Sequence, residues 1–557
     1  MRICISQLNP TIGAIGANTQ KIIHEIALAK KEKATLIIFP EMAIPGYMPD
    51  DLLLYTPFID RIEQALNEII THTTSIAVIV GLPRRSENIL NKALCNSAAV
   101  IMNGKLLGFQ DKALLPTYDV FDERRYFRPA PQEKIWEIGG KRIGITICED
   151  IWPNSGVAGQ EHYPVDPLAV FEKEKPDLLI NISASPYSEG KIETRKEVAK
   201  ACVKRLHCPM ILCNQVGGQD GLLFDGTSVV FSKEGELLQQ AMSFAQDHLL
   251  FDLDQSTPIT PVTEKGAPEL FYALVMGLHD YFVKQGFTKA VLGLSGGIDS
   301  SLVACIAVQA LGKENVLGVL LPSRYTSTQS TEDALAVASN LSVNTMEVSI
   351  ENPYQALLDN LHSLFNGQDH GVVAENIQAR VRGTLLMAIS NKEGYLLLNT
   401  SNKSELAMGY TTLYGDSCGS ISVIGDLLKC QVYDIANWVM KTTGWIPPRI
   451  LEKEPTAELR HNQKDSDTLP EYSILDPIIE ASVVEMKSAE DIATQLSLPL
   501  PFVLDIIQKI HAAEYKRRQC PFQLRVSDKA FSVGRRVPIV EKSLFSTPPG
   551  AYFRAIQ

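Results

Sequence analysis

Residues 294–301 of this 557-residue chain read LSGGIDSS, and this stretch decides how the second half of the chain is expected to fold. It follows a short apolar run, KAVLGL at residues 289–294, and precedes a longer one, LVACIAVQAL at residues 302–311. A strand, a glycine-rich turn and a helix start can bind phosphate, because glycines let the backbone approach the anion and free N–H groups point toward it. The Lys-Ser or Lys-Thr pair of a Walker loop does not follow these glycines, so a different phosphate loop is expected.

The composition limits the classes of protein to which the chain can belong. Its length exceeds what one hydrophobic core supports, so two or more domains are expected. The net charge of −12, from 52 basic and 64 acidic residues, disfavours a nucleic-acid partner. The first residues become polar too soon for a signal peptide, and no apolar run reaches the roughly 20 residues that span a bilayer. The ten cysteines form no C-x-x-C pair, and we expect a cytoplasmic protein with reduced thiols and no membrane.

The order of the apolar segments predicts two α/β domains. Between residues 1 and 250, short apolar runs that suit strands alternate with amphipathic segments, which predicts an α/β sandwich. Residues 251–268 contain three prolines and no periodic pattern, and we interpret them as a linker. Residues 269–557 return to strand–helix units and predict a doubly wound parallel sheet with phosphate chemistry at the carboxyl ends of its strands. Residues 444–474 are polar, proline-rich and aperiodic, as functional lids or disordered segments usually are.

Three residues with catalytic chemistry follow separate strand-like runs of the first domain. Glu41 follows LIIFP, Lys112 follows LLGFQD and Cys148 follows RIGITI. A nucleophilic cysteine needs a base for its proton and a positive charge that stabilises the thiolate and the later oxyanion. A carboxylate and a lysine supply these groups, and backbone N–H groups after Cys148 would complete an oxyanion hole. Each residue alone suits a structural role, but together they indicate nucleophilic catalysis.

The segments around these residues resemble the Glu-Lys-Cys amidases of the nitrilase superfamily. The resemblance rests on FPEMAIPGY, QDKALLPTYDVFDERRYF and GITICEDIW, and it covers nearly all of residues 1–250. It implies that Glu41 is the general base, Lys112 the stabiliser of the oxyanion and Cys148 the nucleophile. On glutamine, such a site would form a γ-glutamyl thioester and release ammonia, and water would then release glutamate.

A further segment of the first domain, NISASPYSEGK at residues 181–191, is similar to the glutamine pocket of such enzymes. The match implies that Tyr118, Ser185 and Lys191 hold the α-amino and α-carboxyl groups of glutamine. A cation for the carboxylate and hydroxyl groups for the polar rim suit that ligand.

The loop at residues 294–301 resembles the SGGxDS loop of ATP pyrophosphatases, which hold the pyrophosphate of ATP and adenylate an oxygen of the substrate. An ammonia-releasing amidase joined to such a domain resembles the glutamine-dependent NAD(+) synthetase family over the whole chain. The resemblance implies that ATP is held by the loop and by a threonine after a later strand: Leu294, Ser295, Gly296, Gly297, Ile298, Asp299, Ser300 and Thr400.

Other segments of the second domain are also similar to this family. NIQARVR at residues 376–382 and NTSNKSE at residues 399–405 match its motifs, and residues 444–474 match its mobile loop. The match implies contacts to deamido-NAD from Asn376, Glu405 and Lys516. It also implies that Asp299 and Glu405 bind Mg²⁺, and paired carboxylates that join a metal to phosphate oxygens suit this role. Asp416 and Lys429 lie in less specific family-like segments.

The reaction implied by this resemblance joins the two domains. Deamido-NAD is adenylated by ATP, and ammonia from L-glutamine displaces AMP to form NAD, with pyrophosphate and glutamate as the other products. Neutral ammonia is scarce at neutral pH, so we expect an internal tunnel from Cys148 to the Ser295 loop, and slow glutamine hydrolysis without deamido-NAD. The family also implies a homo-oligomer.

Three alternatives stay open at the level of the sequence. One is an amidating ligase with another carboxylate substrate, which the motifs at residues 376–382 and 399–405 disfavour. A second is a tRNA-thiolating pyrophosphatase, which would need a basic surface and usually paired cysteines. A third is a non-catalytic sensor of nucleotide or glutamine, which the complete set of Glu41, Lys112, Cys148 and Asp299 disfavours.

Overall fold

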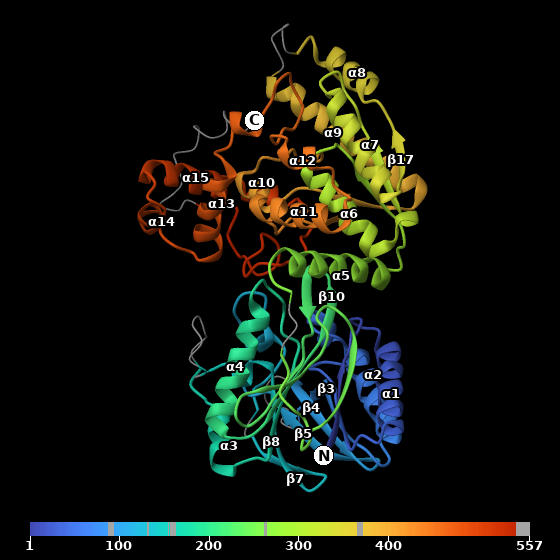
Figure 1. Cartoon of the computed structure of the whole chain (residues 1–557), viewed down its shortest axis with the longest axis vertical. Coiled ribbons are helices and arrows are strands. Elements are labelled where there is room, and N and C mark those ends of the chain that lie inside the picture. The colour runs from blue at the N-terminus through green and yellow to red at the C-terminus, as the bar shows by residue number, and fades with distance from the viewer. Residues whose placement is uncertain are drawn as a thin grey trace. The chain divides into compact units, whose positions relative to one another are not determined.

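The computed structural model describes residues 1–86, 94–130, 133–153, 155, 163–260, 264–364 and 371–541. The chain divides into two compact units, Met1–Glu264 and Lys265–Gln557, whose elements are labelled in Figure 1. The stretch interpreted as a linker, residues 251–268, contains the end of a strand at Asp252 and the start of a helix at Ala267. Within the described residues, no helix combines the length and the apolar character needed to cross a membrane.

The first unit contains two six-stranded sheets and an additional hairpin. The first sheet has the order β14 (Asp247–Asp252), β1 (Arg2–Gln7), β2 (Leu36–Ile38), β3 (Ala77–Arg85), β4 (Leu94–Met102), β5 (Lys105–Asp111). The second has the order β13 (Leu237–Gln240), β12 (Val229–Phe231), β9 (Met210–Asn214), β8 (Leu178–Ser183), β7 (Lys141–Ile147), β6 (Ile135–Ile138). The hairpin pairs β10 (Val216–Gln219) with β11 (Leu222–Asp225).

Alternating apolar side chains hold these sheets together. One apolar cluster combines residues of both sheets, such as Ile5 and Ile38 from the first with Ile145 and Ile180 from the second, all fully buried. Burying a side chain of this size contributes roughly 1.5–3 kcal/mol. Helices α1 (Ile15–Lys31) and α2 (Thr56–Thr71) lie beside the first sheet, and α3 (Leu168–Glu174) and α4 (Lys191–Leu206) lie beside the second (Figure 1). The predicted α/β sandwich is confirmed.

The second unit is built on a five-stranded parallel sheet. Its order is β17 (Asn344–Glu347), β16 (Val316–Leu320), β15 (Ala290–Gly293), β18 (Leu396–Asn399), β19 (Ile421–Ser422). The helices are α5 (Ala267–Gln285), α6 (Ile298–Leu311), α7 (Thr328–Leu341), α8 (Glu351–Leu361), α9 (Gly371–Glu393), α10 (Lys403–Met408), α11 (Lys429–Thr443), α12 (Pro448–Glu452), α13 (Tyr472–Ile479), α14 (Ala489–Leu496), α15 (Leu500–Ala512) and α16 (Glu514–Arg517).

This strand order places the glycine-rich loop where ligands bind in such folds. The chain runs from β15 outward to β16 and β17, and then returns to the other side of β15 with β18 and β19. In open parallel sheets, the crevice for a ligand lies at the carboxyl ends of the strands where this order reverses. The loop at residues 294–301 directly follows β15, so it lies at this point. The predicted doubly wound parallel sheet is confirmed.

The segment at residues 444–474 is more ordered than its composition indicates. It contains α12, a short 3₁₀ helix at Asp465–Asp467 and the first residues of α13. Proline favours the first turn of α12, where Pro448 needs no hydrogen-bond partner for its nitrogen. The elements are too short to leave a periodic pattern, and therefore the sequence did not reveal them.

Candidate functional site

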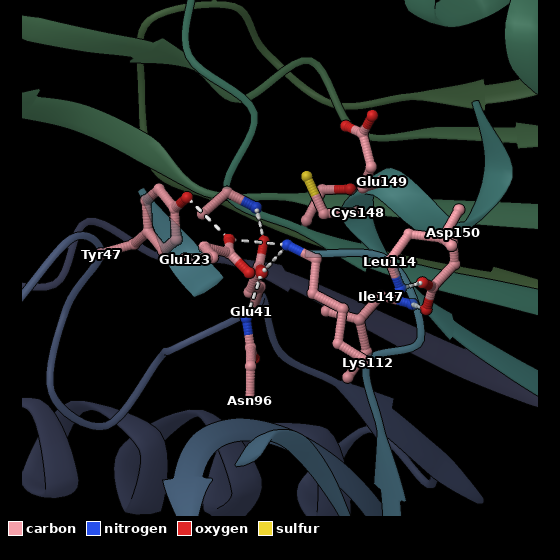
Figure 2. A network of polar contacts seen from close by, with 12 residues as sticks. Glu41, Tyr47, Asn96, Lys112, Leu114, Glu123, Ile147, Cys148, Glu149 and Asp150 are labelled. Carbon is pink, nitrogen blue, oxygen red and sulfur yellow. Dashed lines mark hydrogen bonds and ion pairs between the residues drawn. The ribbon is translucent and has the colours of Figure 1, made fainter. Parts of the chain in front are cut away.

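A buried group of charges lies at the catalytic centre expected in the first unit. The Lys112 Nζ atom is 2.8 Å from Oε1 of Glu41 and 2.7 Å from Oε1 of Glu123. All three side chains are at most 1% exposed. Figure 2 shows that Cys148 lies beside this group. The structure therefore brings Glu41, Lys112 and Cys148 together from three separate strand ends.

Neighbouring groups fix the two carboxylates. The Asn96 side-chain amide donates to Glu41 Oε1 at 2.7 Å, and the Ala184 backbone N–H donates to Glu41 Oε2 at 2.9 Å. The Tyr47 hydroxyl donates to Glu123 Oε1 at 2.9 Å. These bonds leave little freedom for either carboxylate, and buried networks of this kind hold their members in one arrangement.

Cys148 occupies a strained turn directly after β7. It begins a 3₁₀ helix at Cys148–Ile151, and its φ of 45° lies in the left-handed region that residues with a side chain rarely adopt. Such strain costs on the order of 1–3 kcal/mol and often marks functional sites. The turn places the thiol at the end of a strand whose backbone belongs to the second sheet. The position of the cysteine is therefore fixed by the end of a paired strand and not by a flexible loop.

The charges around the thiol set its resting state. Burial, and next the negative charge of Glu41, raise the pKa of Cys148 well above its usual value, while Lys112 acts in the opposite direction. Burial alone would lower the pKa of Lys112, but Glu123 and Glu41 raise it well above its usual value. The centre thus holds a neutral thiol beside a charged lysine. A carboxylate that removes the thiol proton would create the nucleophile when it is needed.

The residues expected to hold glutamine gather around a carboxylate that the sequence analysis did not single out. The Tyr118 hydroxyl donates to Glu149 at 3.1 and 3.0 Å, and Tyr163 donates to the same carboxylate at 3.1 Å. Lys191 lies at the start of α4, with its Nζ 4.3 Å from the centre of the Trp152 ring, and its charge acts on Glu149.

Ser185 lies close in sequence to a bond that fixes the catalytic centre. It is buried and its N–H donates to Asn214 Oδ1 at 3.0 Å, one residue after the Ala184 bond to Glu41. No hydrogen bond joins Ser185 to Tyr118 or Lys191 in the described part of the chain, and the role of all three in holding glutamine stays a prediction.

Four residues of this centre were missed by sequence reasoning: Tyr47, Asn96, Glu123 and Glu149. Glu123 and Glu149 lie inside the quoted segments QDKALLPTYDVFDERRYF and GITICEDIW, so a search for buried carboxylates near Lys112 and Cys148 could have found them. Tyr47 likewise ends the quoted segment FPEMAIPGY. Asn96 has no such signal, because only the pairing of β4 with β3 brings it to Glu41.

A cavity of about 310 Å³ opens at the glycine-rich loop of the second unit. It is lined by most of the residues expected around ATP: Leu294, Ser295, Gly297, Ile298, Asp299, Ser300 and Thr400. Glu405, Asp416 and Lys429 also line it. The strand–turn–helix unit therefore forms one wall of a pocket, and the binding of ATP by these residues stays a prediction.

Gly296 does not line the cavity, but it shapes the loop. Its φ is +77°, and a Cβ atom added there would lie 2.2 Å from the backbone oxygen of Ser330. A side chain is excluded both by the backbone conformation and by the neighbouring chain. The glycine is thus required for the close packing of the loop against the start of α7.

Carboxylates in the cavity gather around one buried lysine. Lys429 Nζ lies 2.5 Å from Asp299 Oδ2 and 3.5 Å from Glu405 Oε1. Asn402 contacts both carboxylates: its side-chain amide nitrogen donates to Asp299 Oδ1 at 2.9 Å, and its backbone N–H donates to Glu405 Oε2 at 3.5 Å. Burial raises the pKa of Glu405 to about 8, with Lys429 acting against it and Asp299 adding to it. The less specific sequence segment around Lys429 thus contains a central residue of the site.

This donor set suits Mg²⁺ when phosphate is also present. Within the described ranges, no three His, Cys, Asp or Glu side chains form a group that could hold a metal alone. Mg²⁺ usually takes one or two carboxylates, and substrate phosphates and waters supply its other ligands. Asp299 and Glu405 provide two such oxygen donors in the cavity, so the residues fit the metal together with ATP.

Two residues expected near deamido-NAD make other contacts. Asn376 on α9 accepts a hydrogen bond from Thr412 at 2.8 Å. Lys516 on α16 donates to the backbone oxygens of Gly409 and Thr411, both at 2.8 Å. Neither residue lines the cavity. Their contact with the substrate stays a prediction.

Part of the segment at residues 444–474 forms a wall of the same cavity. Pro455, Thr456, Ala457, Leu459 and Asp465 line it. The Glu458 carboxylate accepts hydrogen bonds from Ser327 at 2.9 Å and from Ser330 at 2.7 Å, and Lys453 also contacts Ser330. This segment therefore covers the site, in agreement with its expected place over the second active site.

Comparison with known families divides the chain as the structure does. Residues 2–258 match the carbon-nitrogen hydrolase family, and residues 270–520 match the NAD synthase family. A glutamine-dependent NAD(+) synthetase of Synechocystis sp. is 44% identical over 97% of this chain and 98% of its own length. The enzyme of the same name from Thermotoga maritima is 40% identical over 97% of this chain and 99% of its own length.

Solved structures agree with these matches over nearly the whole chain. A glutamine-dependent NAD(+) synthetase from Acinetobacter baumannii, in complex with adenosine diphosphate, has a TM-score of 0.76 and 37% identity. The alignment covers 97% of this chain and 98% of that one. A glutamine-dependent NAD(+) synthetase from Cytophaga hutchinsonii has a TM-score of 0.83 with the same coverage, and its 21% identity supports the fold alone.

Proposed function

The chain belongs to the glutamine-dependent NAD(+) synthetases, and we propose how its own residues divide the work of that reaction. The enzyme is a ligase that amidates deamido-NAD to NAD at the expense of ATP, with ammonia taken from L-glutamine. An adenylated intermediate is formed, and AMP, pyrophosphate and glutamate are the other products. The observation that carries the assignment of residues is the buried Lys112 ammonium between Glu41 and Glu123, beside Cys148.

In the amidase site, Glu41 removes the proton of the Cys148 thiol, and the sulfur attacks the side-chain amide carbon of glutamine. The Lys112 ammonium stabilises the negative charge on the amide oxygen. The proton held by Glu41 passes to the leaving nitrogen, and ammonia departs from a γ-glutamyl thioester. Glu41 then takes a proton from water, which attacks the thioester and releases glutamate and the thiol. Tyr118, Ser185 and Lys191 hold the α-amino and α-carboxyl groups of glutamine during these steps.

In the synthetase site, ATP lies against the loop at residues 294–300 and Thr400. The nicotinate carboxylate of deamido-NAD attacks the α-phosphorus, and pyrophosphate leaves. When Mg²⁺ is bound by Asp299 and Glu405, it neutralises charge on the phosphate oxygens. The charge of Lys429 is held beside both carboxylates and favours the same anionic ligand. Ammonia then attacks the activated carbonyl carbon and AMP leaves, while Asn376, Glu405 and Lys516 contact deamido-NAD.

Three further properties complete the proposal. The species that reacts is neutral ammonia, which is a minor form in water near neutral pH. The ammonia released in the amidase site therefore reaches the synthetase site without equilibrating with solvent. The enzyme works in the cytoplasm, which the ten free cysteines support. It assembles as a homo-oligomer, as the resemblance to its family implies.

The pH dependence of glutamine hydrolysis tests the assignment of the amidase centre. Burial raises the pKa of Glu123 to about 7, while Lys112 acts to lower it. Above this pH the ionised Glu123 shares the charge of Lys112 with Glu41. Below it Glu123 becomes neutral, and Lys112 pairs with Glu41 alone, which changes the charge balance of the centre. We expect kcat/KM for glutamate release to fall about tenfold between pH 8 and pH 6 and to level off at the lower value.

A variant separates Glu123 from other groups that titrate nearby. Burial also raises the pKa of Asp150 to about 7, so the wild-type profile alone does not identify the group. The Glu123→Gln variant carries a neutral side chain at every pH, and it should remain at the low-pH activity without an acidic limb. If kcat/KM of the Glu123→Gln variant still falls as the pH decreases through 7, a group other than Glu123 causes the pH dependence.

A further inference from the structure

We propose that Asp150 is a positioning residue that holds the nucleophile and the catalytic lysine in one fixed arrangement. This inference rests on the proposed amidase function of Glu41, Lys112 and Cys148. Asp150 lies two residues after Cys148 in the same short helix and is 1% exposed. Its carboxylate accepts hydrogen bonds from three backbone N–H groups on two separate segments.

The three bonds connect the chain segments that carry the two catalytic side chains. Oδ1 of Asp150 accepts the N–H groups of Ala113 at 3.0 Å and Leu114 at 2.8 Å, which are the two residues after Lys112. Oδ2 accepts the N–H of Ile147 at 2.9 Å, which is the residue before Cys148. Figure 2 shows the carboxylate between these segments. The Asp150 side chain thus connects the segment that carries Lys112 with the segment that carries Cys148.

The chemistry of the carboxylate suits this position. Ionised carboxylates are acceptors only and form short, strong bonds to backbone N–H groups. Lys112 lies directly after β5, where its N–H donates to the Asn96 oxygen of β4 at 2.8 Å, and Cys148 occupies the left-handed turn after β7. A bond across both segments fixes the strained turn relative to the loop. Misplacement of a reacting group by about 1 Å can lower a rate about 100-fold.

The Asp150→Asn variant tests the proposal, because it keeps the shape but replaces one acceptor oxygen with a donor. We expect kcat for glutamate release to fall 10- to 100-fold, with the KM for glutamine changed less than threefold. The rate of Cys148 alkylation by iodoacetamide should also change, which a merely structural role would not produce at a temperature where the variant is folded. Synthesis of NAD from ammonium salts should stay within twofold of wild type.

The Glu133→Gln variant is the matched control. Glu133 is a buried carboxylate whose charge acts on the same region, and it accepts a hydrogen bond from Gln110. No hydrogen bond joins it to the Lys112 loop or the Cys148 turn in the described residues. We expect wild-type kcat and wild-type alkylation. An Asp150→Asn variant that behaves like this control, while the wild type hydrolyses glutamine, overturns the positioning role.

Hydrogen exchange on the unmodified protein keeps the proposal testable if Asp150→Asn does not fold. The amide protons of Ala113 and Leu114 should be protected although they lie outside any helix or strand. Exchange at the rate of an open loop would overturn the proposal. Absence of glutamate release from the wild type would instead overturn the amidase assignment on which it rests.

Discussion

The Cys148→Ala variant is expected to make no NAD from glutamine while it still makes NAD from ammonium salts. The substitution removes the sulfur atom that forms the thioester, so glutamine-driven synthesis should fall by about 10⁴-fold or more. The ammonia-driven rate should stay within twofold, because the synthetase cavity belongs to the other compact unit. The measurement is NAD formation with each nitrogen source at saturating ATP and deamido-NAD.

Cys208→Ala provides the control for this variant. Cys208 is a buried thiol of the same unit, and burial raises its pKa to about 11. Neither Glu41 nor Lys112 is among the groups that act on its pKa, so it has no base and cation pair to activate it. It should support synthesis from both nitrogen sources. If Cys148→Ala retained full glutamine-driven synthesis, the assignment of the nucleophile would be wrong. Loss of both activities would indicate that the substitution damages more than the amidase site.

The Asp299→Asn variant is expected to lose NAD synthesis from both glutamine and ammonia. Asp299 contributes a carboxylate oxygen to the Lys429 ion pair and a second oxygen to Asn402, and it lines the cavity at the glycine-rich loop. An amide keeps the shape but lacks the charge that binds Mg²⁺ and pairs with Lys429. The rate should fall about 10²- to 10³-fold, and more Mg²⁺ should be needed for half-maximal activity.

Asp434→Asn is the matched control, because Asp434 is an exposed carboxylate on α11, the helix that begins with Lys429. It should leave the rate and the Mg²⁺ requirement unchanged. Glutamate release at saturating glutamine should persist in both variants. Equal synthesis rates in Asp299→Asn and wild type would contradict the role of this carboxylate in the synthetase site.

The sequence predicted those parts of the sites that lie in short continuous segments. Glu41, Lys112 and Cys148 each follow an apolar run, and the glycine-rich loop lies between one strand and one helix. Local patterns of this kind depend on neighbours in the chain, so they can be interpreted without a fold. The same reasoning predicted both α/β units, because strand and helix periodicities differ.

The remaining partners depend on packing between distant segments. Asn96 reaches Glu41 only because β4 pairs with β3 in the sheet that also contains β2. Lys429 lies 130 residues after Asp299, and the fold of the second unit brings them to 2.5 Å. No periodic pattern encodes such contacts. The short elements within residues 444–474 were missed for a different reason, since helices of one turn leave no pattern.

Both sites serve one reaction, and we propose that ammonia passes between them without mixing with solvent. The most direct test incubates the enzyme with ATP, Mg²⁺, deamido-NAD and amide-¹⁵N glutamine in the presence of excess unlabelled ammonium. We expect most of the NAD to carry ¹⁵N, and AMP and pyrophosphate to form with it. Mostly unlabelled NAD would contradict retained ammonia, and no NAD from either source would contradict the assigned reaction itself.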